Sequence, residues 1–319
     1  MTAGAAELTC LAGILASFEE ASAKVLPKMT GLRVSASTVQ RLTEGSGSEL
    51  SKRLHEGETF GPKTPWDWQA DASGHRCAYV SLDATGIGQQ GPGGSKAEGR
   101  MAYVGMIFNP RTQPGHTGQA RYLAGLYELD ELGLQMRRQG AQVGMDDADR
   151  WIGLTDGGNG LEEFLHVQFP RAECILDFYH AAEHLNELAK AWHATDEETK
   201  SVAHKWCHQL KHEGGNAVVA TLEALDRRGR SASVRETHRQ VVQYLRNNEH
   251  RMDYPRYLAN GWLIGSGHIE SACKTVVGGR LKGSGMRWSA DGGDTICHLR
   301  ALFKSEPQQW AAFWQPHLN

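Results

Sequence analysis

The chain lacks the features that mark secreted and membrane-spanning proteins. Its six cysteines are scattered without a CxxC pair, which indicates free thiols in a reducing compartment rather than a disulfide framework. The N-terminus has no basic segment, and Glu7 interrupts it, so we expect no signal peptide. No apolar run approaches the roughly 20 residues of a membrane span. We therefore expect a cytoplasmic protein without a membrane partner.

A strong net charge is also missing from the chain as a whole. The formal charge of -3 over 319 residues gives no overall attraction to nucleic acid. It hides two local excesses of positive charge, because residues 24–54 carry six Lys or Arg against two Glu, and residues 271–304 carry six against two Asp. With 40% hydrophobic residues, the chain can form one large domain or two to three smaller ones.

Three predicted strands end on an aspartate. Residues 77–83, 151–156 and 172–177 are each rich in apolar or β-branched residues, and each stretch closes on Asp. A short helix is expected between the last two strands, so the simplest arrangement is a parallel pair with Asp156 and Asp177 at one edge. The plainer alternative is that each aspartate caps the element that follows it.

A glycine-rich stretch follows Asp83. Residues 86–91 match GxGxxG after a strand, which would indicate a dinucleotide site if a helix began there. Pro92 and a further strand at 101–108 follow instead, so we expect a turn after Asp83 and a β-hairpin with a long glycine-rich loop. A nucleotide-dependent oxidoreductase stays a distant alternative. A strand at 120–126 and a helix at 129–142 complete this region.

The N-terminal region predicts helices. Residues 5–29 form one expected helix, and Ser35 is a good N-cap for a second helix that Gly45 would stop. The apolar stripe of the first helix comprises Leu8, Leu11, Leu15 and Phe18. Two helices with a basic excess are compatible with a DNA-reading helix-turn-helix, and a plain helical hairpin is the alternative. Residues 55–76 are rich in Gly, Pro and polar groups and predict a linker.

Residues 178–258 carry almost only helical patterns. His180 and His184 share one predicted helix face. A second row comprises His204, Cys207, His208 and His212. Its spacing suggests a metal site, but no other cluster with zinc-ligand spacing supports one, and a polar face beside Trp206 is the alternative.

The C-terminal region combines a carboxylate with a basic loop. Ser266 is the expected N-cap of a helix that places Glu270 in its first turn, where the helix dipole favours a carboxylate even without a function. Residues 278–288 alternate glycines with basic side chains, a pattern that suits phosphate binding. From Ala290 on, we expect an amphipathic helix.

Five motifs in order resemble one family. They are SLDATG (81–86), LTDGGNG (154–160), DFYHAAEHL (177–185), GSGHIES (265–271) and RLKGSGMRWS (280–289). Together they are similar to a bacterial insertion-sequence DDE transposase of the ISKra type, which is related to Mutator-like transposases. The resemblance covers roughly residues 20–305. Family members usually carry a longer N-terminal arm, so part of the end-recognition apparatus is expected to be missing.

The resemblance implies an α/β fold with an RNase-H-like core interrupted by an all-helical insertion. The implied division is an N-terminal helical segment at 1–54 that is a candidate for DNA binding, a linker at 55–76, the first part of the core at 77–177, the insertion at 178–258 and the last part of the core at 259–319. In such a core the first and fourth strands lie side by side, which would bring Asp83 and Asp156 together.

The resemblance also implies the site. Asp83, Asp156 and Glu270 would form an acidic triad that holds two Mg²⁺ or Mn²⁺ ions, while Asp177 and His180 would position DNA or support the metal site. The side chains expected to contact DNA are Lys274, Arg280, Lys282, Arg287 and Trp288. Trp206, Trp262 or Trp288 could also stack on an unpaired base, although a buried position is the commoner role for each.

The implied function is metal-dependent phosphodiester hydrolysis and strand transfer at the ends of a mobile element. The implied partners are double-stranded DNA with terminal inverted repeats, target DNA and further copies of the chain in a homo-oligomeric synaptic complex at the bacterial nucleoid. Two alternatives remain, a transposase relic that only binds DNA and an RNase-H-like nuclease that cuts without joining strands.

Overall fold

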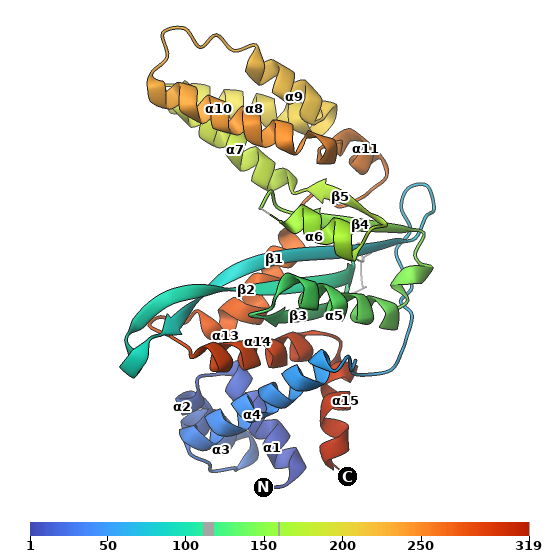
Figure 1. The fold of residues 1–319 in the computed structure, drawn as a ribbon, viewed down its shortest axis with the longest axis vertical. Coiled ribbons are helices and arrows are strands. Elements are labelled where there is room, and N and C mark those ends of the chain that lie inside the picture. The colour runs from blue at the N-terminus through green and yellow to red at the C-terminus, as the bar shows by residue number, and fades with distance from the viewer. Residues whose placement is uncertain (111–117, 159, 319) are drawn as a thin grey trace. The chain divides into compact units, whose positions relative to one another are not determined.

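The computed structural model describes residues 1–110, 118–158 and 160–318. The chain divides into two compact units. The first unit comprises Met1–Trp68, Ala78–Ala148 and His268–Asn319, and the second comprises Gln69–Cys77 and Asp149–Gly267. The fold is α/β, with five strands of mixed direction and many helices (Figure 1). None of the helices in the described part of the chain is both long and apolar enough to cross a membrane.

A long antiparallel hairpin forms the sheet of the first unit. Strand β1 (Cys77–Gln90) pairs with β2 (Lys96–Asn109), which pairs with β3 (Gln119–Gly125). The predicted hairpin is therefore confirmed, but the predicted turn after Asp83 is wrong, because β1 continues through the glycines to Gln90. Asp83 lies opposite Val104 in the middle of the hairpin. The GxGxxG match lies within a strand and in the turn that follows it, and no helix begins there.

Glycine in β1 allows residues 286–288 to pack closely against the strand. Trp288 donates its backbone N–H to the carbonyl of Gly88 at 3.0 Å, and Gln90 donates to the carbonyl of Trp288 at 2.8 Å. A Cβ atom on Gly88 would lie 3.0 Å from the carbonyl oxygen of Met286. Glycine therefore lets residues 286–288 pair along the strand.

The N-terminal region is broken where one helix was expected. Helix α1 (Ala3–Leu15) ends before Ser17, which caps the short α2 (Phe18–Glu20) by accepting the N–H of Glu20 at 3.1 Å. A π-helical turn and α3 (Leu26–Thr30) follow. The predicted apolar stripe is wrong, because Leu8 and Leu15 are 43% and 49% exposed. The buried face carries Cys10, Ala12, Gly13 and Ile14 instead.

Helix α4 (Ala36–His55) begins as predicted but does not stop at Gly45. Ser35 caps it by accepting the N–H of Thr38 at 3.2 Å. A Cβ atom on Gly47 would lie 2.6 Å from Thr295 of α14 (Ala290–Lys304), so the glycine permits a close helix crossing. That packing offsets the cost of glycine in a helix, which is about 1 kcal/mol relative to alanine.

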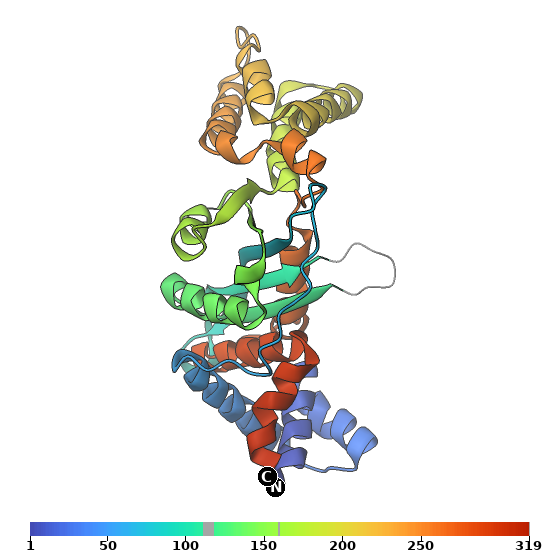
Figure 2. The same ribbon diagram turned by 90° about the vertical axis from the view of Figure 1, so that its right-hand side faces the viewer.

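Helix α5 (Leu129–Gln142) follows the predicted bounds, but α14 is not amphipathic. Residues on all of its faces are buried, because α4, β3 and α15 (Pro307–Leu318) surround it. The indole of Trp310 in α15 donates to Glu7 of α1 at 2.9 Å. Figure 2 shows the two terminal helices side by side in the first unit.

The second unit contains the predicted βαβ segment. Strand β4 (Arg150–Thr155), helix α6 (Leu161–Gln168) and strand β5 (Ala172–Leu176) follow in order, and the two strands are parallel. The helical block predicted at 178–258 is also present (Figure 1). It comprises α7 (Phe178–Trp192), α8 (Asp196–Glu213), α9 (Gly215–Glu223), α10 (Ala232–Asn247) and α11 (Tyr254–Ala259).

The predicted linker is anchored at several points. Trp66 and Trp68 are buried in the first unit, and the indole of Trp68 donates to the carbonyl of Gly144 at 2.9 Å. In the second unit, the carbonyl of Arg76 accepts the backbone N–H of Arg150 at 3.0 Å. Residues 56–76, which the structure describes throughout, form no helix, but the tryptophans make this segment part of the packed structure.

Candidate acidic sites

Asp83 is held by two donors in the first unit. Its Oδ1 accepts the backbone N–H of Ala84 at 2.6 Å, and its Oδ2 accepts the thiol of Cys273 at 3.4 Å. Cys273 begins the π-helical segment Cys273–Gly278, which directly follows α12 (Gly267–Ala272). A π-helical turn is rare and often marks a functional position. Here it places a buried thiol against a predicted catalytic carboxylate.

Glu270 lies three residues before Cys273, on the helix that leads into this turn. It is in the first turn of α12, as predicted, and its half-exposed carboxylate lies 3.6 Å from the ammonium of Lys274. Burial raises the pKa of the Cys273 thiol, and Asp83 raises it further through its charge and hydrogen bond. The charge of Lys282 opposes this rise, and the charge of Glu270 adds a smaller one. Both carboxylates therefore act on one thiol, which stays protonated and able to donate. The first unit thus joins the segments that carry two members of the predicted triad.

Asp156 and Asp177 lie at one edge of the second unit. Asp156 follows β4 and accepts the N–H of Gly158 at 2.8 Å, which closes a tight turn. Asp177 follows β5 and donates its N–H to the carbonyl of Thr155 at 2.8 Å, so the expected adjacency is confirmed. Asp177 is 2% exposed, caps α7 through the N–H of Tyr179 and accepts the hydroxyl of Ser266. The capping alternative thus holds for Asp177.

The helical block supplies two groups that fix the Asp156 turn. Buried Arg251 donates to the hydroxyl of Thr155 at 3.1 Å and lies 3.4 Å from a carboxylate oxygen of Glu162. The hydroxyl of Tyr244 is buried against Gly157, where a Cβ atom would lie only 2.2 Å from it. Burial raises the pKa of Tyr244, and Asp156 and Asp177 raise it further, although Arg251 opposes them.

Tyr244 also connects this turn to the histidines of α7. The ring of His184 lies 3.9 Å from that of Tyr244 between centroids, and the ring of His180 lies 6.1 Å away. Burial, followed by the charge of His180, lowers the pKa of His184. Sequence reasoning missed Tyr244 and Arg251, because only the glycine pair after Asp156 hints that a bulky group approaches there.

The full triad stays a prediction. Asp83 and Glu270 belong to the first unit, and Asp156 belongs to the second. Among the residues that the structure describes, no three His, Cys, Asp or Glu side chains are arranged to hold a metal ion. The histidines of α8 form a row in which the rings of His208 and His212 lie 4.4 Å apart between centroids.

Two of the side chains predicted to contact DNA are buried. Arg280 is 4% exposed and Trp288 is 7% exposed. Lys274, Lys282 and Arg287 are exposed and remain candidates. Lys282 donates to the hydroxyl of Thr85, two residues after Asp83, so one of these cations lies near Asp83.

The tryptophans proposed to stack on a base are core residues. Trp206 and Trp262, like Trp288, are buried, at 3% and 4% exposure. The indole of Trp262 donates to Asp71 at 3.2 Å and its ring stacks on Tyr257. The commoner role for a tryptophan, a buried position, therefore holds for all three.

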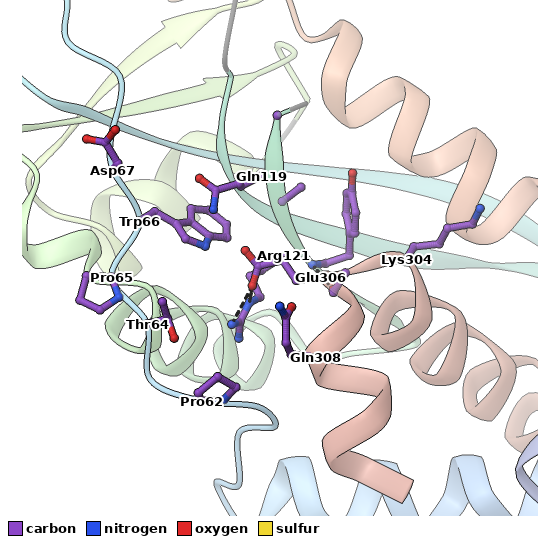
Figure 3. Close-up of a pocket in the computed structure, with 14 residues that line it drawn as sticks. Pro62, Thr64, Pro65, Trp66, Asp67, Gln119, Arg121, Lys304, Glu306 and Gln308 are labelled. Atoms are coloured by element: carbon purple, nitrogen blue, oxygen red, sulfur yellow. Dashed lines mark hydrogen bonds and ion pairs between the residues drawn. The ribbon is translucent and has the colours of Figure 1, made fainter. Parts of the chain in front are cut away.

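A separate polar cavity of about 650 Å³ lies in the first unit (Figure 3). Arg121 and Glu306 form an ion pair in its wall, with an N···O distance of 3.1 Å. Burial lowers the pKa of Arg121, and Glu306 partly restores it. Trp66 and Gln119 form part of the wall. Its buried cation is already neutralised, and none of the predicted triad lines it.

In comparisons with known proteins, no family model matches the chain, and no curated protein matches it.

Proposed function

We propose that the chain is a DDE transposase that hydrolyses and rejoins phosphodiester bonds at the ends of an insertion sequence. The observation that carries the proposal is the hydrogen bond from Cys273 to Asp83, which joins Asp83 to the turn that directly follows the helix of Glu270. By their numbering the two carboxylates are 187 residues apart, so only the fold brings their segments together. The five motifs around these residues add to this support.

The finer fold proposed is an RNase-H-like core with an all-helical insertion. Three antiparallel strands followed by a parallel βαβ segment fit the order of such a core. The helical block lies between β5 and the helix that carries Glu270, where an insertion is expected. In this fold Asp156 of the second unit would complete the triad.

The carboxylate oxygens of Asp83, Asp156 and Glu270 suit Mg²⁺ or Mn²⁺, which prefer hard oxygen ligands. Two such ions would supply an activated water or DNA 3′-hydroxyl and stabilise the leaving oxygen. The thiol of Cys273 fixes the orientation of Asp83 through its hydrogen bond. Lys274, Lys282 and Arg287 would hold backbone phosphates as exposed cations.

The proposed partners are duplex DNA with terminal inverted repeats, target DNA and further copies of the chain. The test is strand cleavage and joining on a duplex that carries the inverted repeats flanking the gene, with Mg²⁺ present. Asp83→Asn, Asp156→Asn and Glu270→Gln should each lower the cleavage rate at least about a hundredfold. Each removes a negative charge that would hold the metal ions, and these ions would stabilise the transition state.

Glu163→Gln is the matched control, because Glu163 is an exposed carboxylate on α6. It should cleave like the wild type. If one triad variant cleaves at the wild-type rate, the replaced residue does not belong to the catalytic site. Cleavage without joining would identify a nuclease, and protection of the repeat ends without cleavage would identify a DNA-binding relic.

A further inference from the structure

A second, smaller cavity lies in the first unit, beside the basic loop at residues 280–288. Its volume is about 280 Å³. Side chains from α2, α4, the end of β1 and the start of α14 contribute to its wall, and buried Arg280 also lines it. Asp83, Asp156 and Glu270 do not line this cavity, although Arg287, a proposed DNA contact, does.

Arg280 is a buried cation without a carboxylate partner among the described residues. Its Nε donates to the carbonyl of Gly13 at 3.0 Å, and its guanidinium carbon lies 4.8 Å from the ring centroids of both Phe18 and Trp288. Burial lowers the pKa of Arg280 to about 10, and the charge of Arg300 contributes to the lowering.

Arg300 is buried in the same way. It donates to the backbone carbonyls of Ile14, Thr275 and Val276 and forms no ion pair within the described part of the chain. The carbonyls of Gly13 and Ile14 belong to the C-terminal turn of α1, whose dipole supplies about half a negative charge. Two guanidinium groups bring two positive charges, and their printed partners among the described residues are carbonyls, a thioether and aromatic rings rather than carboxylates.

The cavity above Arg280 is lined by further groups that suit an anion. Arg287 is exposed at its rim, and Gln90 adds an amide. Ser289 caps the 15-residue helix α14, and Ser17 caps α2, each by accepting a backbone N–H at 3.1 Å. Their hydroxyl hydrogens can therefore donate to a ligand, and the N-terminus of α14 adds a positive dipole end.

We propose that this cavity binds a phosphate group, with Arg280 and Arg287 as its cations and the hydroxyls of Ser17 and Ser289 as donors. The volume suits one phosphate with an attached sugar rather than a whole dinucleotide. The phosphate could belong to a DNA backbone or to a small phosphate ester. The inference rests on the cavity alone and stands whether or not the chain is a transposase.

One carboxylate in the wall provides a sharp test. Glu44 of α4 also lines the cavity, where it accepts the side-chain amide of Gln40 at 3.0 Å. Its negative charge opposes a bound phosphate. Removing this charge should strengthen phosphate binding, and removing the charge of Arg287 should weaken it. An anion held elsewhere on the surface would not respond to these two changes in opposite directions.

The experiment is a calorimetric titration of the full chain with inorganic phosphate. We expect one saturable site, about fivefold weaker in Arg287→Ala and about threefold stronger in Glu44→Gln, as suits single charges at partly exposed positions. Arg33→Ala and Glu49→Gln are matched controls, because both side chains are exposed and lie outside the cavity wall. Both should bind phosphate as the wild type does.

A cavity-filling variant avoids the unfolding expected when Arg280 is replaced. Gln40→Trp adds a large side chain at an exposed wall position and should abolish phosphate binding while leaving the folded state intact by circular dichroism. The proposal is overturned if the wild type shows no saturable binding, if Gln40→Trp binds normally, or if Arg33→Ala weakens binding as much as Arg287→Ala.

Competition with a short 5′-phosphorylated oligonucleotide identifies the source of the phosphate. Displacement of inorganic phosphate would show that the site takes a nucleic-acid phosphate, and continued phosphate binding would show a site for a small ester. Either result upholds the phosphate site. Loss of DNA cleavage in the triad variants would leave these titrations unchanged, so the two proposals fail separately.

Discussion

The thiol of Cys273 lies 3.4 Å from Oδ2 of Asp83 and donates to it. Cys273 and Asp83 are far apart in the sequence, and the π-helical turn at Cys273–Gly278 provides the contact. Because the pKa of this thiol is raised by burial and by Asp83, it remains a donor throughout the physiological range. We regard it as a positioning residue for the proposed metal-binding carboxylate.

Two replacements of Cys273 test whether its hydrogen bond to Asp83 matters for cleavage. Cys273→Ser keeps a donor and should retain most of the DNA-cleavage rate, while Cys273→Ala leaves Asp83 with one donor fewer and should lower the rate about tenfold. The ratio of the Cys273→Ser rate to the Cys273→Ala rate should be largest at low Mg²⁺ concentration, because a loosely held carboxylate binds the ion less well. Cys207→Ala on α8 is the control, and equal rates in all three variants would contradict the positioning role.

Gly157 should not tolerate a side chain while Tyr244 is present. A Cβ atom there would lie 2.2 Å from the Tyr244 hydroxyl, so Gly157→Ala should destabilise the protein by about 1–3 kcal/mol in urea unfolding. Tyr244→Ala in the same chain should recover part of this loss, because it removes the clash. Additive effects of the two changes would show that the two groups do not meet.

Two glycines of α4 should respond to alanine with opposite signs. A Cβ atom on Gly45 would meet open space, with nothing within 4 Å, so Gly45→Ala should stabilise the protein by about 0.5–1 kcal/mol. A side chain on Gly47 would meet Thr295 at 2.6 Å, so Gly47→Ala should destabilise it by about 1–3 kcal/mol. Thermal unfolding of both variants tests the close crossing of α4 and α14. Unfolding temperatures that change in the same direction in both variants would contradict this crossing.

Asp294 should make stability depend on acid pH. Burial acts to raise its pKa, but the hydrogen bond and charge of His298, with the N–H of Leu126, outweigh burial and leave the pKa lowered. A lowered carboxyl pKa contributes stability above the unfolded value of about 3.9, and this stability is lost as pH falls through the folded value.

Urea midpoints measured from pH 6 to pH 3 test this dependence. The wild type should lose stability below about pH 4, and Asp294→Asn should start lower and lose less over the same range. Asp291→Asn is the control, because Asp291 is an exposed aspartate on the same helix. Parallel pH curves for the wild type and Asp294→Asn would exclude Asp294 as the source.

Local patterns were enough to predict several elements. The strands that end at Asp156 and Asp177, the helix between them and the N-cap at Ser35 are where the sequence indicates, because each depends on neighbours within a few residues. Their parallel direction also follows from chain geometry, since a short helical connection leaves little choice. The helical block at 178–258 follows from its periodicity in the same way.

Other predictions depended on partners that the sequence does not reveal. Leu8 and Leu15 lie on an apolar stripe yet are exposed, because α1 packs through its small residues, including Gly13, which approaches Thr43 of α4. The sequence predicts that Arg280 is a surface cation in a glycine-rich loop. In the structure Arg280 is buried and donates to a carbonyl at the end of α1. A local pattern cannot distinguish these outcomes.

By itself, the sequence determined the α/β character, the helical block and the strand ends at Asp156 and Asp177, since hydrogen bonding and side-chain periodicity act over a few residues. Only the tertiary structure decided that β1 continues past Asp83 and which side chains surround all three aspartates. Cys273 meets Asp83, and Tyr244 meets Gly157, because burial of apolar surface brings remote segments together and sequence distance places no limit on which atoms then touch.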